Sequence, residues 1–579
     1  MKLLKKLSWF FKLEKWPYIT GILALSLVSL LNLLPPRVIG EVIDQIASKD
    51  LTNLELAYQL FILVLSALAM YALRFVWRKY ILGTANRLGR ILRYRLFEHF
   101  THMSPSFYQT YRTGDLMAHA TNDINAVVGV AGGGVMSAVD ASITALVTVL
   151  TMFFVLDWRL TLIAILPLPF MAWGTSLIGR KNHESFKAAQ EAFSDLNNKV
   201  QESVSGIKVT KSFGYQDAET AAFARINQDV FKKNILAAKY NALFDPMVLI
   251  FVGLSYLLTL IFGGLFINQG QFTVGELVTF ITYLDMLVWP LQAMGYLFNI
   301  SQRGAVSYER IESLLAQESD VIEVASPITD IKNGRLDYSI QEFAYDDRPT
   351  LRDIHFSIEQ GQTLGIVGVT GSGKTTLLRL LLREQDIQDG NIYLAGHDIR
   401  DYSLSALRSL IGYVPQDQIL FATSIRDNIR FGNPSLSDED VIAVTKLCGI
   451  YEDIMQMPDG FDTLVGERGV SLSGGQKQRL AMCRALILNP DILILDDSLS
   501  AVDAKTEHLI LDNLKRERSG KTTLITAHRL SAVVHADLIL VLDQGRIIES
   551  GSHQELLTQD GWYATTYQNQ QLAESLEEV

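Results

Sequence analysis

Long apolar runs dominate the first half of the chain. A helix rises about 1.5 Å per residue, so a run of roughly 20 residues crosses about 30 Å of hydrocarbon. The first run, Trp16 to Pro36, has 21 residues and no charge. Six such spans are predicted, at residues 16–36, 56–73, 127–156, 160–179, 246–267 and 274–300. The pattern therefore predicts an all-α membrane domain over residues 1–315.

Basic residues set the expected orientation of these spans. They cluster after the second and fourth spans, and they are nearly absent from the short turns after the third and fifth. Because Lys and Arg favour the cytoplasmic side, both termini are expected in the cytoplasm. The connections at 78–126 and 180–245 are polar and favour helix, which predicts membrane helices that continue into the cytosol.

Two carboxylates fall inside the predicted spans. Asp140 and Asp285 would each cost roughly 3 kcal/mol or more if ionised in lipid, so both should face a polar cavity or a partner. Contact with a substrate and structural pairing are the two alternatives for each residue.

The pattern changes at about residue 330. Short β-like runs such as 354–358 and 363–367 alternate with glycines and charged turns, as in a soluble α/β domain. We expect a linker at 316–330, a soluble α/β domain at 331–570 and an acidic tail at 571–579.

Composition supports this division into a membrane part and a soluble part. Hydrophobic residues make up 49% of 579 residues and the formal net charge is -11. Residues 1–320 hold 28 basic and 24 acidic side chains, which leaves 23 basic and 38 acidic for the remainder. An acidic second half argues against nucleic acid as a partner. With Cys448 and Cys483 as the only cysteines, a disulfide scaffold is excluded.

A phosphate-binding loop opens the α/β domain. The segment from Gly368 to Thr375 fits G-x-x-x-x-G-K-T between a strand-like run and a Leu-rich helical run. Its backbone N–H groups approach phosphates, Lys374 supplies a cation and the Thr375 hydroxyl ligates magnesium. The predicted ATP-binding residues here are Gly368, Val369, Thr370, Gly371, Ser372, Gly373, Lys374, Thr375 and Thr376.

A second anion-binding segment stands later in the same domain. The run at 491–496 reads as a buried strand that ends in Asp496, a carboxylate placed to hold the magnesium of a nucleotide. Ahead of it lies Leu-Ser-Gly-Gly-Gln at 472–476, at the start of a helical run. A single nucleotide on the first loop does not need this second site.

These motifs carry a specific resemblance. Leu-Ser-Gly-Gly-Gln is the signature of ATP-binding-cassette (ABC) proteins, and the chain resembles an exporter half-transporter with its membrane domain first. The resemblance implies an ATPase that uses ATP and Mg²⁺, with two cassettes that sandwich each nucleotide between the loop of one chain and the signature of the other. It assigns Tyr345 to adenine stacking, Gln416 to the Q-loop and metal, Ser473, Gly474, Gly475 and Gln476 to the partner's ATP, Asp503 to the D-loop and His528 to the γ-phosphate.

The same resemblance places coupling helices near 113–115 and 214–217 and an X-loop at 465–469. A chain with six spans and one cassette must then dimerise, and the expected location is the plasma membrane of a bacterium.

The residue after Asp496 departs from the family pattern. The family usually has a catalytic glutamate there, and this chain has Asp497. Its side chain is one methylene shorter, and a misplacement of about 1 Å can cost on the order of 100-fold in rate. An intact signature with this Asp resembles the slow-site subunit of heterodimeric bacterial multidrug exporters. In the alternative, the backbone adjusts and Asp497 remains an active base.

The sequence thus predicts one subunit of an ATP-driven exporter of drugs or other amphipathic compounds. A homodimeric lipid flippase is the closest alternative. An ATP-gated channel or nucleotide-sensing regulator is an alternative from another class.

Overall fold

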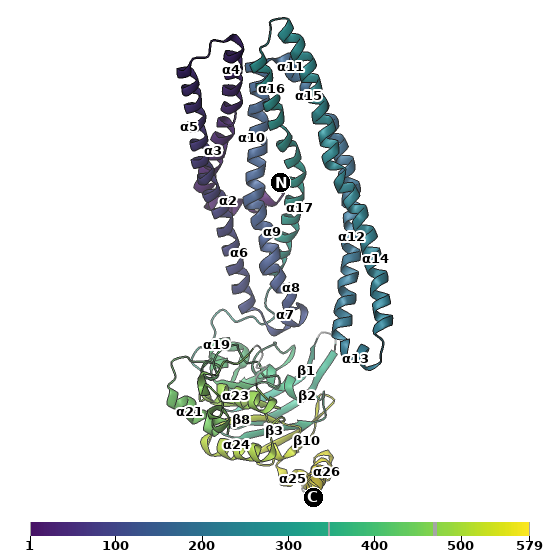
Figure 1. Ribbon diagram of the computed structural model, residues 1–579. Helices are drawn as coiled ribbons and strands as arrows, with labels where there is room; N and C mark the ends of the chain where they lie inside the picture. Colours follow the sequence, from purple (N-terminus) through teal and green to yellow (C-terminus); the bar gives the residue numbers. More distant parts are fainter. Residues whose placement is uncertain (1, 346–347, 467–471, 578–579) are drawn as a thin grey trace. The chain divides into compact units, whose positions relative to one another are not determined.

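The computed structural model describes residues 2–345, 348–466 and 472–577 (Figure 1). They form two compact units. The first holds the residues up to 101 together with 113–317, and the second holds 102–112 and the residues from 318 onward. Residues 318–330, predicted as a linker, therefore fold with the second unit.

Six helical stretches among the described residues are long and apolar enough to cross a membrane, and each contains one predicted span. The stretches are Lys15–Ser48, Asn53–His102, Thr113–Leu156, Trp158–Ser205, Gln216–Asn268 and Val274–Leu315. The prediction of six spans is confirmed. The second and fifth stretches have 50 and 53 residues, so each is about 75 Å long, far more than hydrocarbon requires.

Most stretches consist of several helices in series. The bounds in the first three are α3 (Lys15–Leu31), α4 (Leu34–Ser48), α5 (Asn53–Trp77), η1 (Arg78–Leu82), α6 (Gly83–His102), α8 (Thr113–Ala118), η2 (His119–Asp123), α9 (Ile124–Gly129), η3 (Val130–Gly134), α10 (Val135–Thr151) and η4 (Met152–Leu156). The bounds in the last three are α11 (Trp158–Ile165), α12 (Pro167–Ser205), α14 (Gln216–Ala242), α15 (Phe244–Asn268), α16 (Val274–Met286) and α17 (Val288–Leu315). Two short helices, α1 (Lys2–Lys6) and α2 (Ser8–Leu13), precede them.

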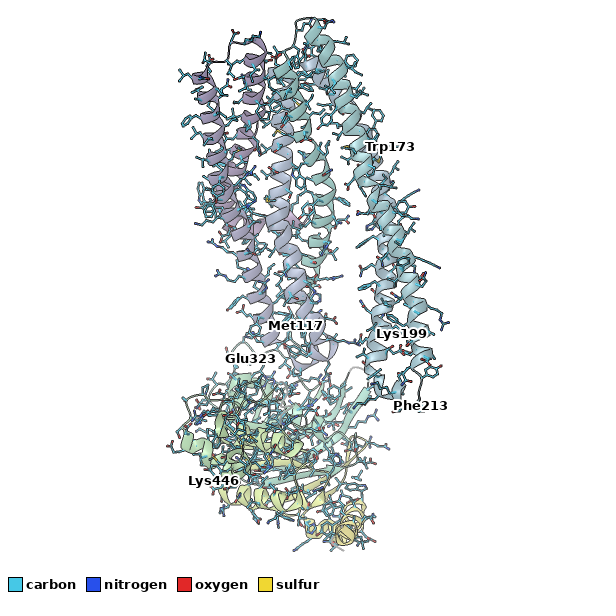
Figure 2. The ribbon with its side chains drawn as sticks, viewed as in Figure 1. Met117, Trp173, Lys199, Phe213, Glu323 and Lys446 are labelled. Carbon is cyan, nitrogen blue, oxygen red and sulfur yellow. The ribbon has the colours of Figure 1, made fainter. Side chains whose placement is uncertain are left out.

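The helices α12 and α14 lie side by side along much of their length. The Lys199 Nζ of α12 lies 2.7 Å from Glu219 Oε1 of α14, which ties their polar ends together. Figure 2 shows Trp173 on the apolar part of α12, where 68% of its surface is exposed. An exposed tryptophan next to a polar extension fits a helix that passes from lipid to water.

Short helices form the turns at the polar ends of these stretches. They are α7 (Pro105–Thr110), which belongs to the second unit, and α13 (Ile207–Ser212). Both come just before the segments 113–115 and 214–217, where coupling helices were expected. Gly214, at a φ of 62°, turns the chain from α13 into α14.

Two sheets form the framework of the second unit. An antiparallel sheet has the order β2-β1-β4-β5, and a mainly parallel sheet has the order β10-β9-β3-β8-β7-β6. The strands are β1 (Leu336–Tyr345), β2 (Arg348–Ile358), β3 (Thr363–Gly368), β4 (Asp389–Leu394), β5 (His397–Asp398), β6 (Ile411–Val414), β7 (Ile492–Asp496), β8 (Thr522–Thr526), β9 (Leu538–Asp543) and β10 (Arg546–Gly551). The helices are α18 (Lys374–Leu381), α19 (Leu404–Ser409), α20 (Ile425–Ile429), α21 (Asp438–Leu447), α22 (Tyr451–Met455), α23 (Gly474–Leu486), α24 (Ala504–Glu517), α25 (His553–Thr558) and α26 (Trp562–Glu577), with the 3₁₀ turns η5 (Ile399–Asp401), η6 (Gly460–Asp462) and η8 (Leu530–Val533).

The parallel sheet separates two hydrophobic cores. Along β7, Ile492 and Ile494 enter the core shared with the antiparallel sheet, and Leu493 and Leu495 enter the core beneath α23 and α24. All four are fully buried. A strand buried on both faces explains the uninterrupted apolar run ahead of Asp496.

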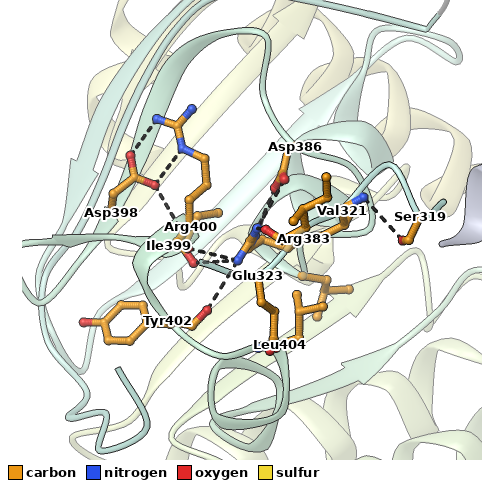
Figure 3. Close-up of polar contacts among 12 residues, drawn as sticks. Ser319, Val321, Glu323, Arg383, Asp386, Asp398, Ile399, Arg400, Tyr402 and Leu404 are labelled. Atoms are coloured by element: carbon orange, nitrogen blue, oxygen red, sulfur yellow. Dashed lines mark hydrogen bonds and ion pairs between the residues drawn. The ribbon is translucent and has the colours of Figure 1, made fainter. Parts of the chain in front are cut away.

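Arg383 fastens residues 318–330 to this unit (Figure 3). Its guanidinium is buried and donates to the Asp386 carboxylate at 2.9 and 3.2 Å and to the Ile322 carbonyl at 3.2 Å. The backbone N–H of Leu404 donates to Glu323 at 2.6 Å. The segment that follows α17 is thus hydrogen-bonded to the end of α18.

The C-terminal helix α26 includes residues 571–577 of the predicted acidic tail at 571–579.

Candidate nucleotide-binding site

The phosphate loop runs from the end of β3 to the start of α18, as predicted. Gly368 has a φ of 141°, and a Cβ there would lie 2.0 Å from the Leu542 carbonyl oxygen. Gly373, just before the helix, has a φ of 103°, and a Cβ would lie 2.7 Å from Leu351. Both positions require glycine, because left-handed backbone and close packing coincide there.

Lys374 begins α18 with its ammonium folded over the loop. Its Nζ donates to the carbonyls of Gly368 at 2.9 Å and Val369 at 3.0 Å. Burial lowers the pKa of Lys374, and the nearby carboxylates of Asp497 and Asp496 oppose this shift. An anion placed against the loop would give this ammonium a stronger acceptor than the two carbonyls.

Ser372 supports the fit of a phosphate in this loop. Its side chain is almost fully buried, and its hydroxyl has no hydrogen-bond partner among the described residues. An oxygen ligand on the loop would satisfy it. Thr370 and Val369 are exposed at the loop surface, and Thr376 is buried in the first turn of α18.

Asp496 ends β7 as a buried carboxylate surrounded by hydroxyl groups. It accepts hydrogen bonds from Thr375 at 2.9 Å, Thr526 at 2.8 Å and Tyr413 at 3.3 Å. The pair Thr375 and Asp496 fits a magnesium ion, which prefers one or two carboxylates with hydroxyl, water and phosphate oxygens. When bound, the ion would neutralise charge on the phosphates. Gln416 is exposed in the loop after β6 and is not part of this hydrogen-bonded group.

Tyr413 and Thr526 are site residues that the sequence analysis did not name. Each lies near the carboxyl end of a strand that pairs with β7, so it faces the same edge of the sheet as Asp496. Strand order would have indicated them, but strand order is not visible in the sequence. Burial and the Asp496 charge raise the pKa of Tyr413, which therefore stays a hydroxyl donor.

Asp497 has a different environment from Asp496. Its φ is 46°, a left-handed conformation, and its N–H donates to the Thr526 carbonyl at 3.1 Å and to the Thr526 hydroxyl at 2.9 Å. Its own carbonyl accepts from Ser500 at 3.0 Å. Burial raises the pKa of the Asp497 carboxyl, and the proximity of His528 opposes that shift. Asp497 and His528 line one pocket with Glu507, and His528 itself is exposed.

Tyr345 is the last residue of β1 and is half-buried. Its ring meets that of Phe343 edge to face at 5.1 Å. The ring packs against the core and is partly exposed.

The signature forms the start of α23, as predicted. Ser473 is the N-cap: its hydroxyl accepts from the N–H of Gln476 at 3.3 Å, and the Gln476 side chain accepts from the Ser473 N–H at 3.0 Å. Asp453 of α22 accepts from Gln476 and Arg479. The described part of the X-loop ends at Gly466, and Glu467 to Gly469 lie outside the described residues.

The D-loop connects the signature helix to Asp497. A Cβ on Gly475 would lie 2.8 Å from the Ala501 carbonyl oxygen, so α23 packs directly on this turn. Gln478 accepts from the Ala501 N–H at 3.0 Å and donates to Ser500 at 3.3 Å. Asp503 caps α24 by accepting from the N–H of Thr506 at 3.0 Å, and that hydrogen bond lowers the pKa of Asp503.

The two membrane carboxylates have side-chain partners in the first unit. Asp285 of α16 accepts a hydrogen bond from the Tyr256 hydroxyl of α15 at 3.0 Å. Asp140 of α10 interacts with the Trp289 indole and, electrostatically, with Arg74. Both carboxylates therefore meet polar groups from neighbouring helices.

Comparison with known proteins identifies the two units. Residues 18–291 match the family described as the ABC transporter transmembrane region, and residues 351–500 match the family described as ABC transporter. The chain is 44% identical over 571 residues to the probable multidrug resistance ABC transporter ATP-binding/permease protein YheI of Bacillus subtilis, with 98% of each chain covered. The chain belongs to the ABC transporters.

Other relatives share the same organisation as this ABC transporter. The multidrug resistance-like ATP-binding protein MdlA of Escherichia coli is 40% identical over 581 residues, with 100% of this chain and 98% of that protein covered. An ATP-bound bacterial Atm1-family ABC exporter is similar in structure, with a TM-score of 0.81, 28% identity and coverage of 96% of this chain and 99% of the other. This ABC transporter is thus an exporter half-transporter and an ATPase that drives transport.

Proposed function

We propose that this ABC transporter is the slow-site subunit of a heterodimeric exporter of drugs or other amphipathic compounds. One observation carries the proposal: Asp497 stands where the catalytic glutamate is expected, and the signature at 472–476 is intact. The chain's own loop would bind ATP and Mg²⁺ at a slow site, and its Ser473 and Gly474 would complete a fast site on the partner.

The backbone around Asp497 supports slow hydrolysis. A side chain one methylene shorter needs a backbone shift of roughly 1 Å to reach the attacking water. A misplacement of that size can lower the hydrolysis rate on the order of 100-fold. The Asp497 N–H is held twice by Thr526, and its carbonyl is held by Ser500. These three hydrogen bonds oppose the adjustment that an active aspartate would require.

The other residues of the nucleotide-binding site have the following roles under this proposal. Tyr345 stacks on adenine, residues 368–376 bind the phosphates, and Thr375, Gln416 and Asp496 hold the magnesium. His528 contacts the γ-phosphate, and Asp503 lies in the D-loop at the interface of the two cassettes. The basic connections after the second and fourth spans support a bacterial plasma-membrane protein with both termini in the cytoplasm.

The experiment compares the chain alone with the chain copurified with a candidate partner half-transporter from the same organism. We expect little ATP hydrolysis from the chain alone and drug-stimulated hydrolysis from the pair, with drug uptake into inverted vesicles. Vigorous hydrolysis by the chain alone would overturn the heterodimer. Downhill flow without accumulation would favour the channel alternative.

A homodimeric lipid flippase is the second candidate. The ATP-dependent lipid A-core flippase of Syntrophus aciditrophicus is 34% identical over 488 residues, with 84% of this chain and 80% of that protein covered. Hydrolysis by the chain alone that is stimulated by lipid and not by drugs would favour this function.

A further inference from the structure

The C-terminal helix α26 is fastened to the cassette at its first turn. The N–H groups of Trp562 and Tyr563 donate to the Glu549 carboxylate of β10 at 2.5 and 3.2 Å. Tyr563 is fully buried, and its hydroxyl lies 2.8 Å from His553 Nδ1. The course of α26 is therefore set by the sheet and the core.

Two helical turns further on, Gln570 meets the loop that carries His528. Its Nε2 donates to the His528 carbonyl at 2.9 Å, and its Oε1 accepts from the Leu530 N–H at 2.9 Å. One carboxamide thus holds the backbone on both sides of Arg529. A carboxylate could keep the Leu530 bond but not the His528 bond, and an apolar side chain could make neither.

Among the residues that the structure describes, the His528 loop has one other side-chain anchor close by, the Glu507 carboxylate. The Ser531 hydroxyl donates to Glu507 at 2.9 Å, and the Arg529 guanidinium lies 3.6 Å from the same carboxylate. Both contacts lie after His528 in the chain. The hydrogen bond from Gln570 is made to the carbonyl of His528 itself. It therefore directly restrains the backbone that carries the exposed imidazole.

We propose that Gln570 is a positioning residue for His528. It fixes the loop so that the imidazole is held ready for the γ-phosphate, and the C-terminal helix thereby contributes to recognition of ATP over ADP at the chain's own site. The inference rests on the role of His528 under the proposed function.

The test uses the full-length transporter with its partner. ATP and ADP affinities at this chain are measured by photolabelling of the resolved chain. Gln570→Leu should weaken ATP binding by roughly 3- to 10-fold, because a misplaced imidazole would lose about one hydrogen bond to the γ-phosphate. ADP binding should not change. Gln571→Leu is the matched control, because Gln571 bonds to the Tyr567 hydroxyl and not to the loop. Exchange of the Leu530 amide hydrogen should accelerate in Gln570→Leu only.

His528→Ala separates the possible failures. We expect His528→Ala to weaken ATP binding. In the His528→Ala background, Gln570→Leu should cause no further loss of ATP affinity. If His528→Ala weakens binding and Gln570→Leu does not, the positioning role is wrong and the His528 role stands. If His528→Ala has no effect, the His528 role fails and this inference fails with it. An equal Gln570→Leu loss in both backgrounds would also overturn it. Should Gln570→Leu not assemble, Gln570→Glu tests the His528 bond alone.

Discussion

The cassette carries two anion-binding regions that are built in different ways. In the phosphate region, the loop at 368–375 and the buried Asp496 are joined by the Thr375 hydroxyl into one hydrogen-bonded group. In the signature region, Ser473 caps α23, which begins at Gly474, and the contacts of that helix lead to α22 and the D-loop. The first region is held together by hydrogen bonds within the chain. Under the proposed function, the second region would contribute its helix N-terminus to a site formed with another chain.

The largest effect is expected in the signature region. Gly474→Asp places a carboxylate at the helix start, where a phosphate of the partner's ATP would bind, and should reduce ATP hydrolysis of the heterodimer by 100-fold or more, on the order of the loss of a transition-state donor. Hydrolysis is measured in the purified pair.

Gly474→Ala is the matched control for this substitution. Among the described residues, a Cβ at Gly474 would meet Ala501 Cβ at 3.7 Å, an ordinary contact, so the variant should fold. Retained hydrolysis in Gly474→Asp would show that the signature region does not serve an active site.

A substitution in the phosphate region should primarily weaken ATP binding. Lys374→Ala removes the buried ammonium and should weaken ATP binding to this chain by about 1.5–3 kcal/mol, the range for hydrogen bonds to charged groups. Photolabelling of the chain with ATP checks this, with the exposed Lys515→Ala as control. Equal labelling of Lys374→Ala and the parent would refute the loop assignment.

The membrane domain provides a change that should leave both regions intact. If Asp285 contacts cationic substrates, Asp285→Asn should lower cation transport by several-fold, about one charge-assisted contact, without changing basal hydrolysis. Transport of neutral compounds should be unaffected. Tyr256→Phe removes only the 3.0 Å hydrogen bond to Asp285. Equal losses for cations and neutral compounds in both variants would favour structural pairing.

The smallest effect is expected at the apparent catalytic residue. Asp497→Asn should change hydrolysis of the proposed heterodimer by about twofold or less, because under the proposed function the fast site would use a catalytic glutamate of the partner. Asp497→Glu should raise hydrolysis at the chain's own site. A loss in Asp497→Asn as complete as in Gly474→Asp would mean that the two regions do not serve different sites.

The pH dependence of the slow site gives a further check on Asp497. Burial raises the pKa of this carboxyl, so it binds a proton at a higher pH than an exposed aspartate does. As the pH is lowered, residual hydrolysis at this site should therefore decrease at a higher pH than it would with an exposed aspartate. Asp497→Asn should abolish this pH dependence. The measurement is single-turnover hydrolysis with the partner's glutamate replaced by Gln.

Much of this architecture follows from local sequence patterns. The six spans are predictable because runs such as 16–36 are uninterrupted, and the phosphate loop because its glycines and Lys374 are fixed in spacing. Thr526 and Tyr413 were not predictable, because they reach Asp496 across the sheet from 30 and 83 residues away. The Gln570 contact spans 42 residues and depends on the course of α26. Such contacts are set by tertiary packing, which periodicity does not encode.

The contacts of the buried Arg383 extend the cassette ahead of its first strand. Sequence alignment with the ATP-binding family starts at residue 351, and the first strand starts at Leu336. A cassette expressed from either point would lack the Ile322 carbonyl and leave a buried guanidinium N–H unpaired, at a cost of about 1–3 kcal/mol. The folded cassette therefore includes the stretch from about residue 318. Exchange of cassettes between transporters should succeed more often when the junction is placed ahead of that stretch.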